Sequence, residues 1–194
     1  MRSKYRHIGV VVFFITVWCL WAAVPAHAET WRFLHTKYLK LRFKSDRDLI
    51  EFNRKIEFGG ESGGFFSFRS QNKQGKDLND EIIRKVDRLV EKVQIILDMR
   101  KPFRKVNVNL YPDAGALHQA YFKLYRARKQ PRAWYTFERN TIYMNVQDVF
   151  AGMLAHEVAH AVVDHYLTVR PPRATAEILA RYVDQHLNEK AKVY

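Results

Sequence analysis

The stretch MLAHEVAHAVVDHY, residues 153–166, constrains the fold more than any other part of the chain. Apolar residues occupy nearly every turn and nearly every side of a helix here, which is typical of a helix through the middle of a domain. Three histidines and a glutamate interrupt it, and buried ionisable groups are costly unless a partner satisfies them. We expect a buried helix from Asp148, as its N-cap, to about Arg170, where Pro171 forbids continuation.

The spacing of the polar residues in this helix indicates a metal site. His156 and His160 lie four residues apart in an H-E-x-x-H pattern, so their imidazoles share one face, about 40° apart around the axis. Glu157 is offset from both, near enough to touch a water on a shared ion. His165 is about 180° from His156 and points away. Two neutral imidazoles suit zinc, while the alternative is a pair of core histidines hydrogen-bonded to backbone or acids.

A third ligand has to come from another segment. Pro171 and Pro172 force a turn, and RATAEILARYVDQHL, residues 173–187, begins a further helix. A helix that folds back across the first would bring Glu177 to the ion and complete a His, His, Glu set. The alternative is that Glu177 is a solvated carboxylate favoured by the helix N-terminus.

HEVAH followed by AEILARYV resembles the gluzincin branch of zinc metallopeptidases. The resemblance is to its short peptidase-MA-like domains, which carry a Pro-x-W-L-x-E-G-x-A-x-Y segment after the HExxH helix. Four residues match that segment in register: Pro172, Glu177, Ala180 and Tyr182. The family's usual Trp and Gly are Ala174 and Ile178 here, which leaves the ligands in place and alters the substrate pocket. The motif-level match covers roughly residues 140–187.

The resemblance implies an α+β, zincin-like fold with a small mixed or antiparallel sheet. It implies one zinc ion per chain, held by His156, His160 and Glu177, and hydrolysis of peptide bonds by a zinc-activated water with Glu157 as general base. The sequence does not identify the residue that would stabilise the oxyanion formed during hydrolysis. Asp164 is either a residue that orients a ligand or a solvated aspartate at the helix end.

The resemblance also implies a place for the substrate. In such folds the strand just before the HExxH helix is the edge of the sheet, and substrate adds to it as an antiparallel strand. In this sequence that strand is NTIYMNV, residues 140–146. The backbone of Tyr143, Met144 and Asn145 is therefore the expected substrate strand.

The rest of the chain alternates between strand and helix patterns and shows no internal repeat or linker. We expect one α+β domain over residues 29–194. Its remaining elements are predicted as a strand at 36–44, a short helix or strand at 46–56, a glycine-rich hairpin loop at 57–70, a helix at 78–100, a strand at 105–111, a helix at 113–129 opened by Asp113, and a hairpin at 133–146.

The N-terminus is typical of a secretory signal peptide, residues 1–28. It has a basic head, an apolar stretch at 8–24, and small residues Ala26 and Ala28 that form an A-x-A cleavage site. We expect export to the periplasm or the extracellular space, with cleavage after Ala28. The alternative is an uncleaved membrane anchor at 8–24. The mature chain has no cysteine, which excludes disulfides and thiolate ligands.

The chain carries a formal charge of +13, or +10 once the signal and its three basic residues are removed. Such a surface attracts anionic partners, which for an exported protein are envelope lipids and wall polymers. The denser patches, KYLKLRFK and YFKLYRARK, carry no nucleic-acid motif and are interpreted as solvated faces.

We therefore expect an exported zinc metallopeptidase acting on peptides or proteins. One alternative is a non-catalytic basic envelope protein whose zinc site is structural or a relic. A weaker one is an enzyme that cuts a non-peptide amide of the cell wall.

Overall fold

The structure, a computed structural model, describes residues 30–57 and 75–188. The predicted signal peptide 1–28, its alternative as an anchor at 8–24, and nearly all of the predicted loop at 57–70 lie outside the described residues. Within those ranges, no helix combines the length and apolarity needed to cross a bilayer.

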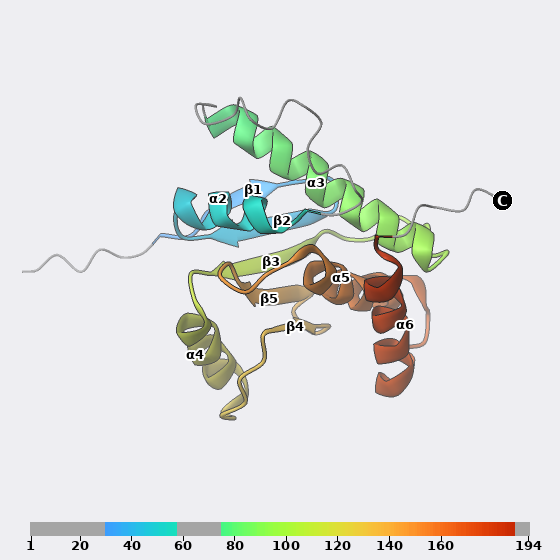
Figure 1. Ribbon diagram of the computed structural model, residues 1–194. Helices are drawn as coiled ribbons and strands as arrows, with labels where there is room; N and C mark the ends of the chain where they lie inside the picture. The colour runs from blue at the N-terminus through green and yellow to red at the C-terminus, as the bar shows by residue number, and fades with distance from the viewer. Residues whose placement is uncertain (1–29, 58–74, 189–194) are drawn as a thin grey trace, which may run out of the picture. The chain divides into compact units, whose positions relative to one another are not determined.

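Five strands form one mixed sheet in the order β1-β2-β3-β5-β4 (Figure 1). The central strands β2, β3 and β5 are parallel, and β1 and β4 pair antiparallel at the two edges. Their bounds are β1 Arg32–His35, β2 Leu39–Phe43, β3 Val106–Tyr111, β4 Ala133–Thr136 and β5 Thr141–Asn145. The expectation of an α+β protein with a small mixed sheet is confirmed at this level.

The strand predicted at 36–44 is β2, which begins at Leu39 after a turn at Thr36, and the strand β1 lies before the predicted range. The hydroxyl of Thr36 accepts hydrogen bonds from the N–H groups of Tyr38 and Leu39, which closes the turn before β2 begins. Such local side-chain bonds compete with strand pairing. The chain therefore reverses here, and β1 pairs back onto β2.

In the described part of the chain, five helices accompany the sheet: α2 Asp46–Lys55, α3 Gly75–Ile96, α4 Ala114–Tyr125, α5 Ala151–Tyr166 and α6 Arg173–His186. The segment left open between helix and strand is the helix α2, because Ser45 and Asp48 form a capping box at its start. Asp113 caps α4 as predicted, its carboxylate accepting from the N–H of Ala116 at 2.8 Å.

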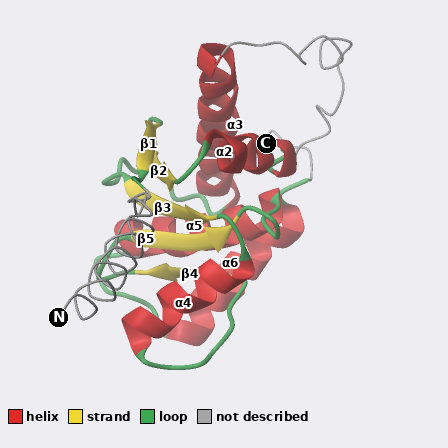
Figure 2. Cartoon of the chain, turned by 90° about the vertical axis from the view of Figure 1, so that its left-hand side faces the viewer, coloured by secondary structure: helices red, strands yellow, loops and turns green. Residues whose placement is uncertain are grey.

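One hydrophobic core lies between a single face of the sheet and four of the helices. Leu41, Val108 and Ile142 point from the strands to buried residues of α2, α3, α5 and α6. The alternate strand residues face the other side, where Tyr121 and Tyr125 of α4 contact Trp134. Figures 1 and 2 accordingly show α4 at the β4–β5 end of the sheet and α3 at the β1–β2 end.

The prediction that β5 is the sheet edge is wrong. β5 pairs with β3 on one side and with β4 on the other, and all five of its residues are buried. The backbone of Tyr143, Met144 and Asn145 is therefore covered and cannot serve as the substrate strand. The physical reason is the hairpin itself, because a tight turn at Asn140 places β4 along the open side of β5.

The capping box of α2 provides a test of the fold. We expect Ser45→Ala to lower the free energy of unfolding by about 1 kcal/mol, since the N–H of Asp48 then loses its acceptor. Urea denaturation measures the change. Thr168→Ala is the control, because it removes an exposed hydroxyl in the loop between α5 and α6. Equal losses in the two variants would contradict the assigned role of Ser45.

Candidate metal centre

The helix α5 passes through the core, as its apolar sequence predicts. Ten of its sixteen residues are buried, Glu157 among them. It begins at Ala151 after Phe150, so the prediction that Asp148 caps it is wrong. The carboxylate of Asp148 instead accepts from Arg132, whose Nη2 lies 2.6 Å away. Because Asp148 pairs with Arg132, sixteen residues earlier in the chain, its carboxylate does not cap α5.

One stripe of α5 is only partly covered, and both histidines are on it. Met153, His156, His160 and Asp164 follow one another at helical spacing along this stripe. The side chains of His156 and His160 are 24% and 16% exposed. Their rings lie 5.0 Å apart between centroids, so the predicted shared face is present.

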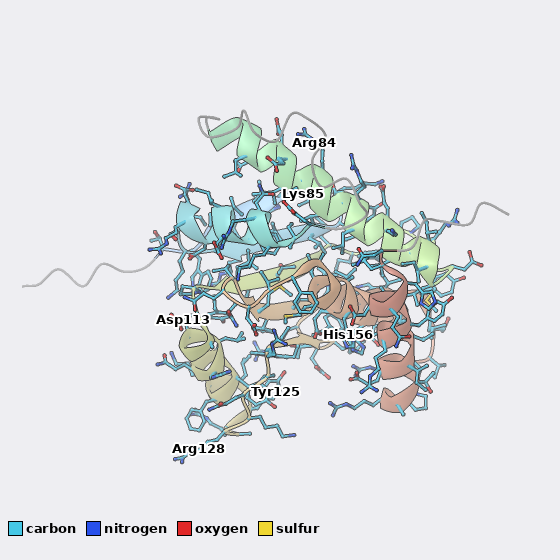
Figure 3. All side chains as sticks on the ribbon, viewed as in Figure 1. Arg84, Lys85, Asp113, Tyr125, Arg128 and His156 are labelled. Atoms are coloured by element: carbon cyan, nitrogen blue, oxygen red, sulfur yellow. The ribbon has the colours of Figure 1, made fainter. Side chains whose placement is uncertain are left out.

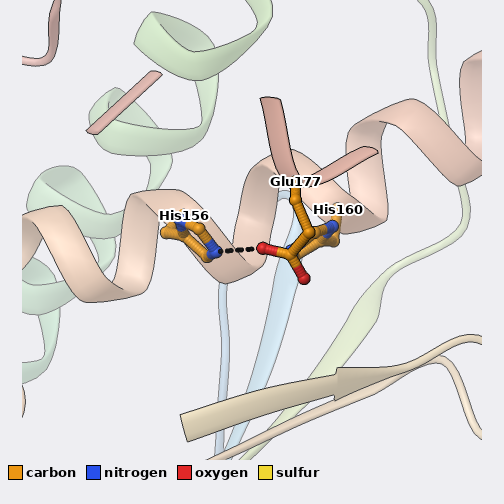
Figure 4. A group of neighbouring side chains, drawn as sticks. All are labelled: His156, His160 and Glu177. Atoms are coloured by element: carbon orange, nitrogen blue, oxygen red, sulfur yellow. Dashed lines mark ion pairs between the residues drawn. The ribbon is translucent and has the colours of Figure 1, made fainter. Parts of the chain in front are cut away.

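The helix α6 brings a carboxylate to this stripe. Its residues Ala180 and Val183 are buried in the core, and α6 packs closely along α5. One turn earlier, Oε2 of Glu177 lies 3.6 Å from Nε2 of His156, and Oε1 lies 3.8 Å from Nε2 of His160 (Figure 4). The sequence prediction that a helix after the two prolines folds back to both histidines therefore matches the geometry.

The three side chains can hold a metal ion. Each offers one ligand atom, and these atoms all lie within 4.8 Å of one another. The two separations from Glu177 are too long for hydrogen bonds. Two ligands bonded to zinc at about 2.05 Å and at tetrahedral angles stand about 3.4 Å apart, close to what is found here. Two imidazole nitrogens and one carboxylate oxygen are also a donor set that zinc accepts, so these residues fit that ion.

Burial shifts the titration of two side chains in the centre. Burial first, and then the neighbouring His156, lower the pKa of His160 to about 4, so the imidazole is held neutral. A neutral imidazole is the form that binds a metal.

Glu157 stands beside the three ligands without joining them. It is 8% exposed, and burial, followed by the charge of Glu177, raises its pKa to about 8. A hydrogen bond from the backbone N–H of Tyr135 opposes the rise. A divalent cation on the three ligands would likewise favour the ionised form, because opposite charge stabilises a carboxylate.

Two further residues singled out in the sequence lie outside the cluster. Nδ1 of His165 donates to the carbonyl of Ala161, 2.7 Å away, and the ring packs on Phe103. Its exclusion as a ligand agrees with the geometry. The side chain of Asp164 is 5% exposed and pairs with Nε of Arg170 at 3.1 Å, so it is not a solvated aspartate. In the described part of the chain it makes no hydrogen bond to His156 or His160, so no contact supports a role in orienting a ligand.

Sequence reasoning missed the role of Arg170. Besides Asp164, its guanidinium lies 4.0 Å from Glu138 and stacks over the ring of Phe137 at 4.9 Å. It thereby ties the loop before α6 to the turn between β4 and β5. No periodic pattern marks such a residue, because its partners are far apart in the chain.

Comparison of the chain with protein-family models, with curated proteins and with solved structures gave no match. The fold and the site define the class: an α+β protein with a five-stranded mixed sheet and a candidate metal centre of two histidines and one glutamate.

The Arg170 contact gives a prediction with a defined pH dependence. Arg170→Ala leaves the carboxylate of Asp164 buried without its cation, so we expect the free energy of unfolding at neutral pH to fall by about 1–3 kcal/mol. Burial raises the pKa of Asp164, so the ionised carboxylate is the less stable form in the folded protein. The deficit should therefore grow as the pH rises through that pKa and shrink as the carboxyl is protonated below it.

Urea titrations from acid to neutral pH, with chelator present, measure this dependence. The control is the double variant Asp164→Asn/Arg170→Ala, in which no buried charge is left and most of the stability should return. A deficit that stays constant across the titration would show that Arg170 acts through its packing on Phe137 alone.

Proposed function

We propose that the protein is a zinc metallopeptidase of the gluzincin type with a zincin-like fold. The observation that carries the proposal is the convergence of His156, His160 and Glu177, with the buried Glu157 beside them. A structural zinc site is closed by four protein ligands. Three ligands and an adjacent carboxylate are typical of a catalytic site.

Each residue has a distinct role in this proposal. The two imidazoles and Glu177 would hold the ion. Zinc, when bound, supplies Lewis acidity, which lowers the pKa of a coordinated water and polarises a substrate carbonyl. Glu157 accepts the proton of the attacking water and passes it to the departing amine. Its apolar surroundings support this role, because burial keeps its pKa from falling far below neutrality.

The exposed edge of the sheet supports a peptide as the substrate. Among the described strands, β4 pairs with β5 alone, and the N–H of Tyr135 is directed to Glu157. In a strand, the N–H and C=O of one residue point to the same side. The carbonyl of Tyr135 therefore faces the metal centre, where a substrate N–H can donate to it. An extended peptide added antiparallel to β4 would place its scissile bond beside Glu157.

We also propose that residues 1–28 direct export, so that the enzyme works in the periplasm or outside the cell. The basic head, apolar stretch and A-x-A site of the sequence support this. Sequencing the N-terminus of the protein recovered from the envelope tests it. A mature chain that begins at Glu29 agrees with cleavage after Ala28, and an intact N-terminus would favour an anchor.

Metal content is the first test of the site. We expect the purified protein to carry about one zinc per chain and His160→Ala to lose it, because two remaining ligands bind zinc much more weakly. Plasma mass spectrometry after gel filtration measures the ratio. His165→Ala is the matched control, since it removes a histidine of the same helix that lies outside the cluster, and it should retain the metal. Absence of stoichiometric zinc from both the wild type and the control would contradict the proposal.

Catalysis is tested separately from metal binding. Glu157→Gln should keep the zinc and lower peptide hydrolysis by about 10²–10⁴-fold, because only the proton acceptor is removed. A fluorogenic peptide library assayed beside cell-wall fragments measures the rate. Glu57→Gln, an exposed substitution on the loop after α2, is the control. Unchanged phenotypes in Glu157→Gln would favour a non-catalytic envelope protein, and cleavage of wall fragments alone would favour an amidase.

A further inference from the structure

The helix α4 is apolar in sequence but poorly covered. Only Leu117 among its twelve residues is buried, whereas the ten-residue α2 buries four. Phe122 is 44% exposed and Tyr125 is 43% exposed. The sheet therefore covers one narrow side of α4 and leaves aromatic surface in water.

Positive charge surrounds this exposed aromatic surface. From Ala114 to Phe137 the sequence has five basic residues and no acidic one. The basic residues are Lys123, Arg126, Arg128, Lys129 and Arg132. Among the described residues, Arg132 is the only one of the five with an ion pair, which it makes to Asp148. The other four cations are exposed at the end of α4 and in the turn after it.

A pocket joins the two features. The left-handed backbone of Arg126, with φ of 52°, ends α4 and turns the chain back along it. The groove formed there is open to solvent and about 460 Å³ in volume, with Phe122 in its wall and Lys123, Arg128 and Lys129 around it. Its volume is in the usual range for a small-molecule site, and its lining includes no carboxylate. Figure 3 shows Tyr125 and Arg128 at this end of the molecule and Arg84, on α3, at the other.

We propose that α4 and the turn at 126–130 form a docking surface for the anionic phospholipids of a bilayer. An apolar pocket with a cationic rim complements an anion attached to a hydrocarbon chain. Exposed aromatic side chains between basic ones are the usual composition of a surface that sits in the headgroup region. An acidic peptide would be attracted by the cations but leaves Phe122 and the apolar wall without a role. This surface is independent of the metal centre.

Vesicle binding by the full chain tests the surface. The probes are vesicles of equal parts phosphatidylglycerol and phosphatidylcholine, compared with vesicles of phosphatidylcholine alone. Each basic residue near an anionic surface contributes about five-fold to the partition coefficient. The triple variant Lys123→Gln/Arg128→Gln/Lys129→Gln should therefore lose on the order of 100-fold in binding to the anionic vesicles. Its zinc content and thermal midpoint should match those of the wild type.

The matched control removes three exposed cations elsewhere: Arg47→Gln/Arg84→Gln/Lys101→Gln. It should lose only a few-fold, because charges beyond about 10 Å of the lipid are screened. The N-terminal segment is common to all variants, so its contribution cancels in the ratios. Phe122→Ser should weaken binding several-fold without a change of charge.

Three results would overturn the proposal. Equal losses in the two triple variants would show that net charge alone attracts the vesicles. Equal binding to both kinds of vesicle would exclude anionic recognition. Release of the protein from vesicles by low-micromolar polyglutamate would show that the surface takes an acidic peptide instead. Should the N-terminal segment hold every variant on the vesicles, titration with monomeric dihexanoylphosphatidylglycerol decides, because wild type should bind it and the first triple variant should not.

Discussion

The packing of α6 along α5 holds the core and the candidate metal centre together. Ala180, Val183 and Leu187 of the C-terminal segment enter the core in helical steps. Glu177 lies one turn before Ala180, so the same apolar contact that buries α6 sets its carboxylate over His156 and His160. An ion bound there would cross-link two helices that already pack against each other. Its affinity would therefore depend on how stably the apolar residues of α6 are buried against α5. The candidate metal centre therefore depends on the same helix packing as the fold.

The apolar surroundings of α5 also determine the electrostatics of the centre. They push Glu157 and His160 in opposite directions, the pKa of the acid upward and that of the base downward, so that both move toward their neutral forms. The imidazole of His160 is held neutral, and the carboxylate of Glu177 lies beside both histidines. A dication compensates the carboxylate and makes ionised Glu157 less costly. Burial of these polar side chains would destabilise the protein without an ion, whereas with an ion bound it would strengthen their interaction with the metal.

The sequence predicts those features that depend on local periodicity. The helix with its two histidines, the exclusion of His165 and the cap at Asp113 follow from spacing within a few turns, and the structure agrees with each. The position of Glu177 was predictable because a proline turn followed by a short helix leaves few directions for the chain. One error involves a distant partner, because the carboxylate of Asp148 pairs with Arg132 and does not cap α5. The other lies within a single hairpin, where β4 pairs along the predicted edge of β5. Arg170 carries no local signal, since Asp164, Glu138 and Phe137 meet only in three dimensions.

The strand β4 links the two surfaces of the protein. Because strand residues alternate between faces, Tyr135 lies on the α5 side, where its N–H contacts Glu157, and Trp134 lies on the α4 side. Trp134 stacks on Tyr143 with centroids 4.6 Å apart and meets Tyr121 and Tyr125 edge to face. Among the described residues, its buried indole N–H has no hydrogen-bond partner. The strand β4 therefore contributes one residue to each face of the sheet, Trp134 to the contacts of α4 and Tyr135 to the core beside α5.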